Sequence, residues 1–225
     1  MTGPADLVHP TAIIGDVHGR VDRLSAAIGD VGDRRCILVG DYINKGPDSR
    51  AVLDFLVSEK AQRGDNLVLL RGNHDHLLLE VFQGRSDLSD LVRHGGLPTI
   101  KSYVGIPEPD VLRQFKRLFP VSHLNLLAST NLFFEEDGLF VSHAGWNPKD
   151  PESRTPKDLI LGGQPDVFDP ACPPPQQLAV FGHYQQWDGE PFCTADRICL
   201  DTGCGSDPDR PLTVLRLPER DFRQF

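Results

Sequence analysis

The sequence predicts an α/β fold built on two sheets. Short apolar runs alternate with helix-like segments over the first 85 residues, which is typical of βαβ units and a largely parallel sheet. Five more strand-like runs follow residue 130, with few helices between them. We therefore expect a second, mixed sheet packed on the first, with helices outside both.

The first half supplies three strands and three helices in turn. The run Thr11–Ile14 is apolar and β-branched and ends in a glycine, which indicates the first strand. The next expected elements are a helix over 21–28, a strand over 36–39, a helix that begins at 47–49 with Asp48 or Ser49 as its cap, a strand over 67–70 and a helix over 76–83 that Gly84 can close.

The rest of the chain has a helical segment followed by strands with few helices between them. Residues 86–129 look helical and carry no metal-type motif. The later strands are expected at 132–135, 139–142, 179–181, 197–200 and 212–217. Because no internal repeat or long linker divides the chain, we expect one domain over residues 1–225, with 86–129 as a helical insert within it.

The composition argues against a nucleic-acid-binding, membrane or secreted protein. The 225 residues include 23 Lys and Arg against 32 Asp and Glu, a formal net charge of −9 that argues against non-specific nucleic-acid or membrane binding. No apolar stretch reaches the roughly 20 residues needed to span a bilayer, and residues 1–10 do not resemble a signal peptide. The five cysteines include no C-x-x-C pair, so we expect reduced thiols in a cytoplasmic protein, with a Cys193–Cys199 disulfide as the alternative.

Five short motifs place polar side chains at or just after the expected strands. They read Gly15-Asp16-Val17-His18-Gly19, Gly40-Asp41, Gly72-Asn73-His74-Asp75, His143-Ala144-Gly145 and Gly182-His183. In open α/β sheets, ligands bind beyond the carboxyl ends of the strands. Asp, His and Asn without Cys form a ligand mixture that suits a pair of divalent metal ions and the hydrolysis of phosphate esters.

The spacing indicates how these side chains could share two metals. Asp16 and His18 are two residues apart in an extended segment, so they point to one face and can hold one metal. The two oxygens of Asp41 can bridge both metals. The residues expected to complete the second metal are Asn73, His143 and His183. Any one of these residues alone would more simply be a cap or a satisfied polar group, so the prediction depends on the five motifs together.

The motif order resembles the phosphoprotein phosphatase (PPP) branch of the metallophosphoesterase superfamily, over nearly the whole chain. The family pattern is GD-x-HG, GD-x-x-DRG, GNH followed by an acidic residue, HAG and GH. The resemblance implies a calcineurin-like domain, a four-layer α/β/β/α sandwich of two mixed sheets with outer helices, and two divalent metals, usually manganese, iron or zinc. It implies Asp16, His18 and Asp41 as ligands of one metal, and Asp41, Asn73, His143 and His183 as ligands of the other.

The resemblance also implies a mechanism. A water or hydroxide held between the metals attacks phosphorus in line, and a general acid protonates the leaving oxygen. His74 matches the family's residue for that acid, and beside Asn73 we favour this role over that of a histidine that only caps a helix. Arg71 matches a family arginine that grips phosphate, a role that a guanidinium fork suits. Asp201, at the end of a late strand, is expected to support the site.

The chain departs from the family pattern where Asp-Arg-Gly becomes Asn44-Lys45-Gly46. Asn44 can accept a hydrogen bond from the catalytic histidine but cannot supply a negative charge, so His74 should be less readily protonated. Lys45 keeps the positive charge of the missing arginine without its bidentate geometry, and we expect it to bind substrate phosphate. Gly163 stands where bacterial relatives usually carry another phosphate-contacting arginine.

Two groups of relatives share features with the chain. Asn44 and the aromatic Tyr184 are similar to symmetrical diadenosine tetraphosphate hydrolases, whereas His18 and the segment 95–103 are similar to small bacterial protein phosphatases. We expect a metal-dependent phosphatase that hydrolyses phosphomonoesters, either phosphoserine/threonine proteins or a small phosphorylated molecule. The alternatives are a symmetrical diadenosine tetraphosphate hydrolase and a catalytically weak metal-binding regulatory module. The expected partner is a phosphorylated substrate, with no nucleic acid and no membrane.

Overall fold

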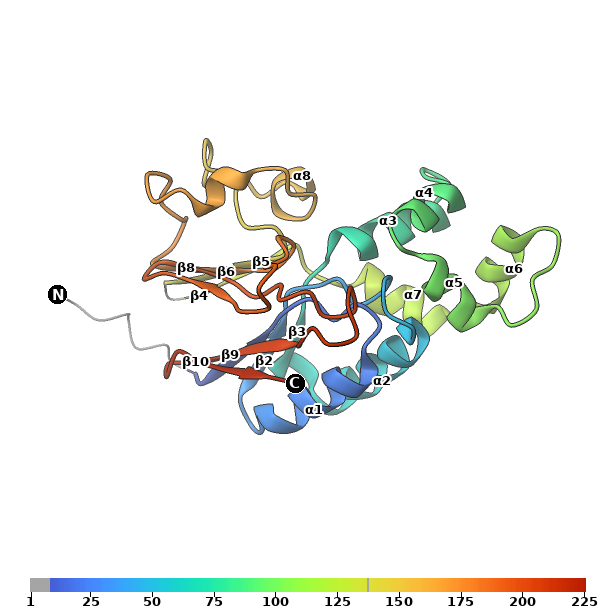
Figure 1. Cartoon of the computed structure of the whole chain (residues 1–225), viewed down its shortest axis with the longest axis horizontal. Helices are drawn as coiled ribbons and strands as arrows, with labels where there is room; N and C mark the ends of the chain where they lie inside the picture. The colour runs from blue at the N-terminus through green and yellow to red at the C-terminus, as the bar shows by residue number, and fades with distance from the viewer. Residues whose placement is uncertain (1–8, 137) are drawn as a thin grey trace.

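Two five-stranded sheets pack face to face in the computed structural model, which describes residues 9–136 and 138–225 (Figure 1). The strand order is β10-β9-β1-β2-β3 in the first sheet and β4-β5-β6-β8-β7 in the second. Each sheet contains parallel and antiparallel pairs. The prediction of an α/β fold with two mixed sheets and outer helices is confirmed.

The first sheet combines early and late segments of the chain. Its strands are β1 (Thr11–Ile14), β2 (Arg35–Leu38), β3 (Leu67–Leu69), β9 (Thr213–Leu217) and β10 (Asp221–Gln224). The prediction that the run at 212–217 belongs to the second sheet is wrong, because β9 pairs antiparallel with β1, with Ile14 opposite Val214. The strand β10, at the sheet edge, was not predicted because its sequence is mostly polar.

Three helices follow the parallel strands. They are α1 (Val21–Val31), α2 (Ser49–Arg63, which continues into η1, Gly64–Asn66) and α3 (Asn73–Phe82). Their apolar faces and the strands form one buried cluster that includes Leu24, Ile28, Val52 and Leu56. The helix α3 begins three residues before its predicted start, because the Asp75 carboxylate accepts the Gly72 N–H and caps the first turn.

Four short helices occupy the predicted helical segment. They are α4 (Leu88–Arg93), α5 (Leu97–Tyr103), α6 (Val111–Leu118) and α7 (Val121–Ala128), and they extend to one side beyond α3 and α2 (Figure 1). Tyr103, Phe115 and Phe119 join these helices through aromatic contacts, with ring centroids 4.6–5.7 Å apart. The chain then returns to the first sheet, where Asn131 bridges to Leu70.

The second sheet has a thinner outer layer than the first. Its strands are β4 (Phe133–Glu136), β5 (Leu139–Ser142), β6 (Leu178–Phe181), β7 (Phe192–Cys193) and β8 (Arg197–Cys199). Its outer face is covered by α8 (Pro156–Leu159), η2 (Pro165–Phe168) and loops, which pack on Phe140, Trp146 and Phe181. All five cysteines are free, and Cys193 lies opposite Ile198 rather than Cys199.

An apolar interior holds the two sheets together. Residues that face this interior from the first sheet include Ile13, Ile37 and Leu215, and those from the second include Val141 and Val180. Both sets are fully buried. Because the sheets meet along this layer, the carboxyl ends of β1, β2, β5 and β6 lie close together. Among the described residues, none of the helices combines the length and the apolar character that crossing a bilayer requires.

Candidate metal centre

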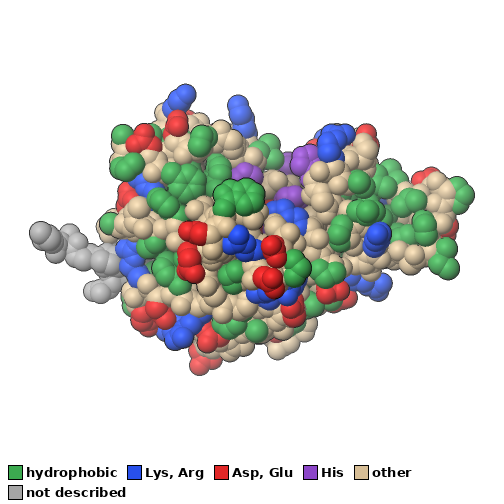
Figure 2. Space-filling view, in the orientation of Figure 1, with side chains coloured by type: hydrophobic (Ala, Val, Ile, Leu, Met, Phe, Trp, Pro, Cys, Tyr) green, Lys and Arg blue, Asp and Glu red, His purple; other side chains and the backbone are tan. Residues whose placement is uncertain are grey.

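The carboxyl ends of five strands bring the predicted ligands to one place. Asp16 and His18 follow β1, Asp41 follows β2, Asn73 opens α3 after β3, His143 follows β5, and His183 follows β6. Figure 2 shows histidine side chains gathered in the saddle between the part of the molecule that carries α8 and the part that carries α4. The structure therefore brings all six side chains together from both sheets.

Asp41 lies in the middle of the group. Its Oδ2 atom is 3.5 Å from His18 Nε2, 3.6 Å from His143 Nε2 and 3.8 Å from His74 Nε2. Two sets of ligand atoms, one on His18, Asp41 and His74 and the other on Asp16, Asp41 and His143, each lie within 4.8 Å of one another. Asp41 belongs to both sets, which is the position that a shared ligand would occupy.

The local backbone is shaped to bring these side chains close. His18, Asp41 and His183 have φ values of +43°, +54° and +65°, a region that side-chain-bearing residues rarely adopt. The glycines before the ligands allow close approach: a Cβ on Gly72 would lie 2.0 Å from Asp41 Oδ1, and one on Gly182 would lie 1.9 Å from Asp16 Oδ1. Such strain is typical of functional sites.

Backbone carbonyls fix the orientation of two of the histidines. His18 Nδ1 donates to the Ile43 carbonyl at 3.0 Å, and His143 Nδ1 donates to the Val39 carbonyl at 3.2 Å. Burial lowers the pKa of both rings well below the ordinary value, so both are neutral. Each Nε2 atom therefore carries a lone pair that faces the Asp41 carboxylate. A carbonyl that accepts a hydrogen bond from the other ring nitrogen orients metal-binding histidines in this way.

Acceptor atoms face one another in the part of the centre nearer the second sheet. His143 Nε2 lies 2.9 Å from Asn73 Oδ1, and both are acceptors. His183 Nδ1 lies 3.1 Å from the same oxygen and 3.3 Å from His143 Nε2. Burial raises the pKa of Asp16 and of Asp41, and their mutual repulsion adds to the shift of Asp16. Converging lone pairs and buried carboxylates form a donor set that fits divalent cations.

Asp75 supports the centre from behind, a role that sequence reasoning did not assign. Its carboxylate accepts the N–H groups of Asp41 at 2.8 Å, Tyr42 at 3.1 Å and Gly72 at 3.0 Å. These bonds tie the end of β2 to the start of α3. The signal was the acidic residue that follows Asn73 and His74 in the motif. Asp201 is buried close to Asp16, where its charge contributes to raising the pKa of Asp16.

Asn44 contacts His74, but in the opposite sense to the prediction. Asn44 Nδ2 lies 2.8 Å from His74 Nδ1, whereas Thr99 Oγ1 donates to Asn44 Oδ1 at 2.9 Å. Because its oxygen is already engaged and its Nδ2 also faces the His94 carbonyl, Asn44 donates to the ring rather than accepting from it. With Asn44 as the donor, the ring proton of His74 is assigned to Nε2. Burial, with nearby Lys45 adding to it, lowers the pKa of His74 to about 3.

The two predicted phosphate-binding residues lie in different surroundings. The Lys45 Nζ atom is 2.8 Å from His18 Nε2, inside the centre. The Arg71 guanidinium donates to Thr130 Oγ1 at 2.9 Å and to the Ala128 carbonyl at 2.9 Å, and its contact with substrate phosphate stays a prediction. These bonds use the guanidinium to anchor the loop after α7.

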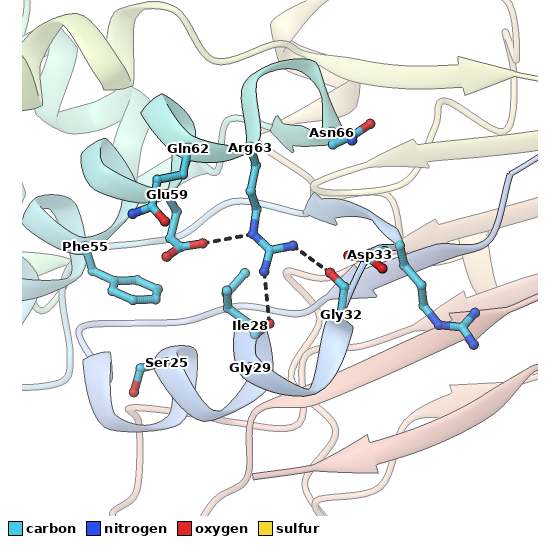
Figure 3. Close-up of a pocket in the computed structure, with 11 residues that line it drawn as sticks. Ser25, Ile28, Gly29, Gly32, Asp33, Phe55, Glu59, Gln62, Arg63 and Asn66 are labelled. Carbon is cyan, nitrogen blue, oxygen red and sulfur yellow. Dashed lines mark hydrogen bonds and ion pairs between the residues drawn. The ribbon is translucent and has the colours of Figure 1, made fainter.

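Two surface cavities differ in their relation to the centre. A cavity of about 530 Å³ adjoins it, and its lining includes Lys45, Arg20 and Ser206. Another, of about 580 Å³, lies between α1 and α2 and contains none of the predicted site residues. Figure 3 shows Arg63 reaching across this second cavity, where it bonds to Glu59 and to backbone carbonyls of the facing loop and helix.

Comparisons with known proteins show the family of the chain. Residues 9–186 match the model of the calcineurin-like phosphoesterase family. A symmetrical bis(5'-nucleosyl)-tetraphosphatase from Klebsiella pneumoniae (strain 342) is 34% identical over 143 residues, 62% of this chain and 44% of the relative. The chain therefore matches less than half the length of that relative.

Two other similar proteins cover nearly the whole chain. The asymmetrical bis(5'-nucleosyl)-tetraphosphatase PrpE from Oceanobacillus iheyensis is 27% identical over 93% of this chain and 89% of its own length. The crystal structure of "a putative diadenosine tetraphosphatase" has a TM-score of 0.62 at 21% identity, covering 98% of this chain and 95% of that one. With the family model matching most of its length, the chain belongs to the calcineurin-like phosphoesterase family.

Proposed function

We propose that the protein is a metal-dependent phosphoric ester hydrolase with a binuclear centre for divalent cations, manganese being our first candidate and iron or zinc the alternatives. The ligands would be Asp16, His18, Asp41, Asn73, His143 and His183. The observation that supports this proposal most strongly is the convergence of acceptor atoms, with His143 Nε2 only 2.9 Å from Asn73 Oδ1. When bound, such cations supply a nucleophile from water near neutral pH and neutralise charge on phosphoryl oxygens.

His74 is the proposed donor to the leaving oxygen. Its Nε2 carries the ring proton, because Asn44 donates to Nδ1 at 2.8 Å. The ring is held at the edge of the centre, with Nε2 3.8 Å from Asp41 Oδ2. A neutral imidazole with a donor on one side can offer a hydrogen bond from the other, which is the geometry that general acid catalysis requires.

The same contact favours a second candidate function, the hydrolysis of dinucleoside polyphosphates. A second proton on His74 would require Nδ1 to become a donor, and Asn44 Nδ2 already donates to it. His74 is therefore a weak acid, which suits a phosphoanhydride, whose phosphate leaving group needs less protonation than an alkoxide. The relatives described as bis(5'-nucleosyl)-tetraphosphatases support this candidate.

A two-substrate assay tests both functions. The Mn²⁺-loaded protein is incubated with p-nitrophenyl phosphate and with diadenosine tetraphosphate, alongside Asp41→Asn and the exposed-site control Lys101→Gln. We expect turnover by the wild type and by the control but not by Asp41→Asn. Two ADP per diadenosine tetraphosphate would indicate symmetrical cleavage, whereas AMP and ATP would indicate asymmetrical cleavage. Metal-dependent turnover of neither these nor any other phosphoester would overturn the proposal and favour a metal-binding regulatory module.

A further inference from the structure

The candidate centre has two halves, one around His18 and one around Asn73, His143 and His183. Among the described residues, a lysine contacts the ligand atom of the first half only. In the half that contains His18, the Lys45 Nζ atom lies 2.8 Å from His18 Nε2, so a charged donor meets the lone pair. In the half that contains Asn73, His143 and His183, the three ligand atoms lie 2.9–3.3 Å apart. Within the described chain, no lysine or arginine nitrogen is hydrogen-bonded to any of those three atoms.

Backbone hydrogen bonds hold Lys45 where its side chain can contact His18. Its N–H donates to the Gly95 carbonyl at 2.9 Å and its φ is +59°, while the Gly46 N–H donates to the His18 carbonyl at 3.1 Å. The turn is thereby anchored to the segment that carries His18. The lysine stem, by contrast, has four rotatable carbons and ends in a compact charge, so the ammonium can leave without disturbing the turn.

The buried carboxylates of Asp16 and Asp41 explain why the Lys45 ammonium stays beside His18. Asp16 and Asp41 are both only 2% exposed, and Asp41 Oδ2 lies 3.5 Å from His18 Nε2. Two buried carboxylates need a nearby positive charge, which Lys45 supplies from inside the protein. A divalent cation at His18 would need the same lone pair that the ammonium now engages, and the two positive charges would repel each other.

We propose that Lys45 is an internal counter-cation that a metal must displace to bind at the His18 half of the centre. This inference rests on the proposed metal centre. The half formed by Asn73, His143 and His183 fills first, and the His18 half fills second and more weakly. Lys45 also lines the adjoining cavity of about 530 Å³, so the displaced ammonium remains beside the centre and becomes available to a substrate phosphate.

Calorimetric titration of Mn²⁺ into metal-free protein tests this order. The wild type should show two binding events, the second weaker than the first. Lys45→Asn removes the charge while keeping a residue that tolerates positive φ, and it should tighten the second event by about tenfold to a hundredfold. The first event should tighten by a smaller factor, because Lys45 is hydrogen-bonded to none of its three ligand atoms. The control Lys101→Gln, at an exposed position of α5, should bind as the wild type does.

Two further variants make the result unambiguous. His18→Asn should lose the second event and keep the first, which assigns the weaker event to the His18 half. Lys45→Arg keeps the charge and should leave the second event weak, and it serves as the folded comparison if Lys45→Asn melts early. Two wild-type binding events of equal affinity would overturn the inference about Lys45, and so would unchanged affinities in folded Lys45→Asn. Either result would leave the proposed metal centre standing. A wild type that binds no metal would overturn the proposed centre itself.

Discussion

The first sheet contributes both carboxylates of the candidate centre, Asp16 and Asp41, whereas the second contributes two neutral imidazoles, His143 and His183. The first sheet is covered by the long helices α1 and α2, and the second by a four-residue helix, a 3-10 turn and loops. The negative charge of the candidate centre therefore comes from the sheet that the long helices cover. The second sheet completes the proposed ligand set, so neither sheet forms the candidate centre alone.

The two sheets also differ in how their outer layers are held. On the first sheet, apolar helix faces form an extended buried cluster. On the second, the buried guanidinium of Arg197 donates to the carbonyls of Val167 and Asp169 and so fastens η2 to β8. We therefore expect changes at Asp41, the proposed shared ligand, to abolish function, whereas changes in the outer layers should affect stability first.

The largest effect is expected where the two sheets meet. Asp41→Asn keeps the size of the side chain but removes the charge that lies near both His18 and His143. We expect kcat/KM for p-nitrophenyl phosphate to fall on the order of 10³-fold, with loss of bound metal. Steady-state kinetics and elemental analysis measure the two quantities. Retention of both within tenfold of wild type would show that Asp41 is not shared.

A smaller effect is expected at the proposed proton donor. His74→Asn should lower kcat about 10²-fold while metal content stays at the wild-type level. Its N–H still donates to Asp41 Oδ1 from the backbone, so the ligand geometry should survive. Kinetics with metal analysis on the same sample provide the check. A parallel loss of metal would instead mean that His74 acts as a ligand.

The outer layer of the second sheet should show a stability effect. Arg197 is 1% exposed, and Arg197→Met would leave the carbonyls of Val167 and Asp169 without their donor. We expect the free energy of unfolding to drop by about 2 kcal/mol, measured by urea denaturation. Arg223→Met, at an exposed position of the first-sheet strand β10, is the matched control and should change it by less than about 0.5 kcal/mol. Equal effects would remove the contrast between the two layers.

The smallest effect is expected in the cavity between α1 and α2. Arg63→Gln removes hydrogen bonds to the carbonyls of Gly32 and Ile28, at 3.0 and 3.3 Å (Figure 3). We expect a loss of about 1 kcal/mol in unfolding free energy and no change in kcat/KM. A marked fall in activity with intact stability would assign that cavity a role in catalysis.

The strands that the sequence predicted best are those marked by a local pattern of apolar residues. The strands Thr11–Ile14 and Leu139–Ser142 were placed without error, because each is a short apolar run with clear limits. The sheet to which β9 belongs could not be read from its own residues, since its partner β1 lies about two hundred positions earlier. The strand β7 has two residues, too few to give a periodic signal.

The candidate centre was predicted as a set of residues but not in its internal contacts. Strand-end motifs indicated which side chains would converge, because parallel strands end at one edge. The direction of the Asn44 bond depends on Thr99, 55 positions away, and the position of Arg71 depends on acceptors near Thr130. Such competing partners are brought in by tertiary packing, and single motifs contain no information about them.

The most direct test of the whole account is anomalous diffraction from crystals of the Mn²⁺-loaded protein. We expect two peaks at the junction of the sheets, one on either side of Asp41, with all six proposed ligands around them. Peaks only at other sites, or crystals of loaded protein with none among these residues, would contradict it.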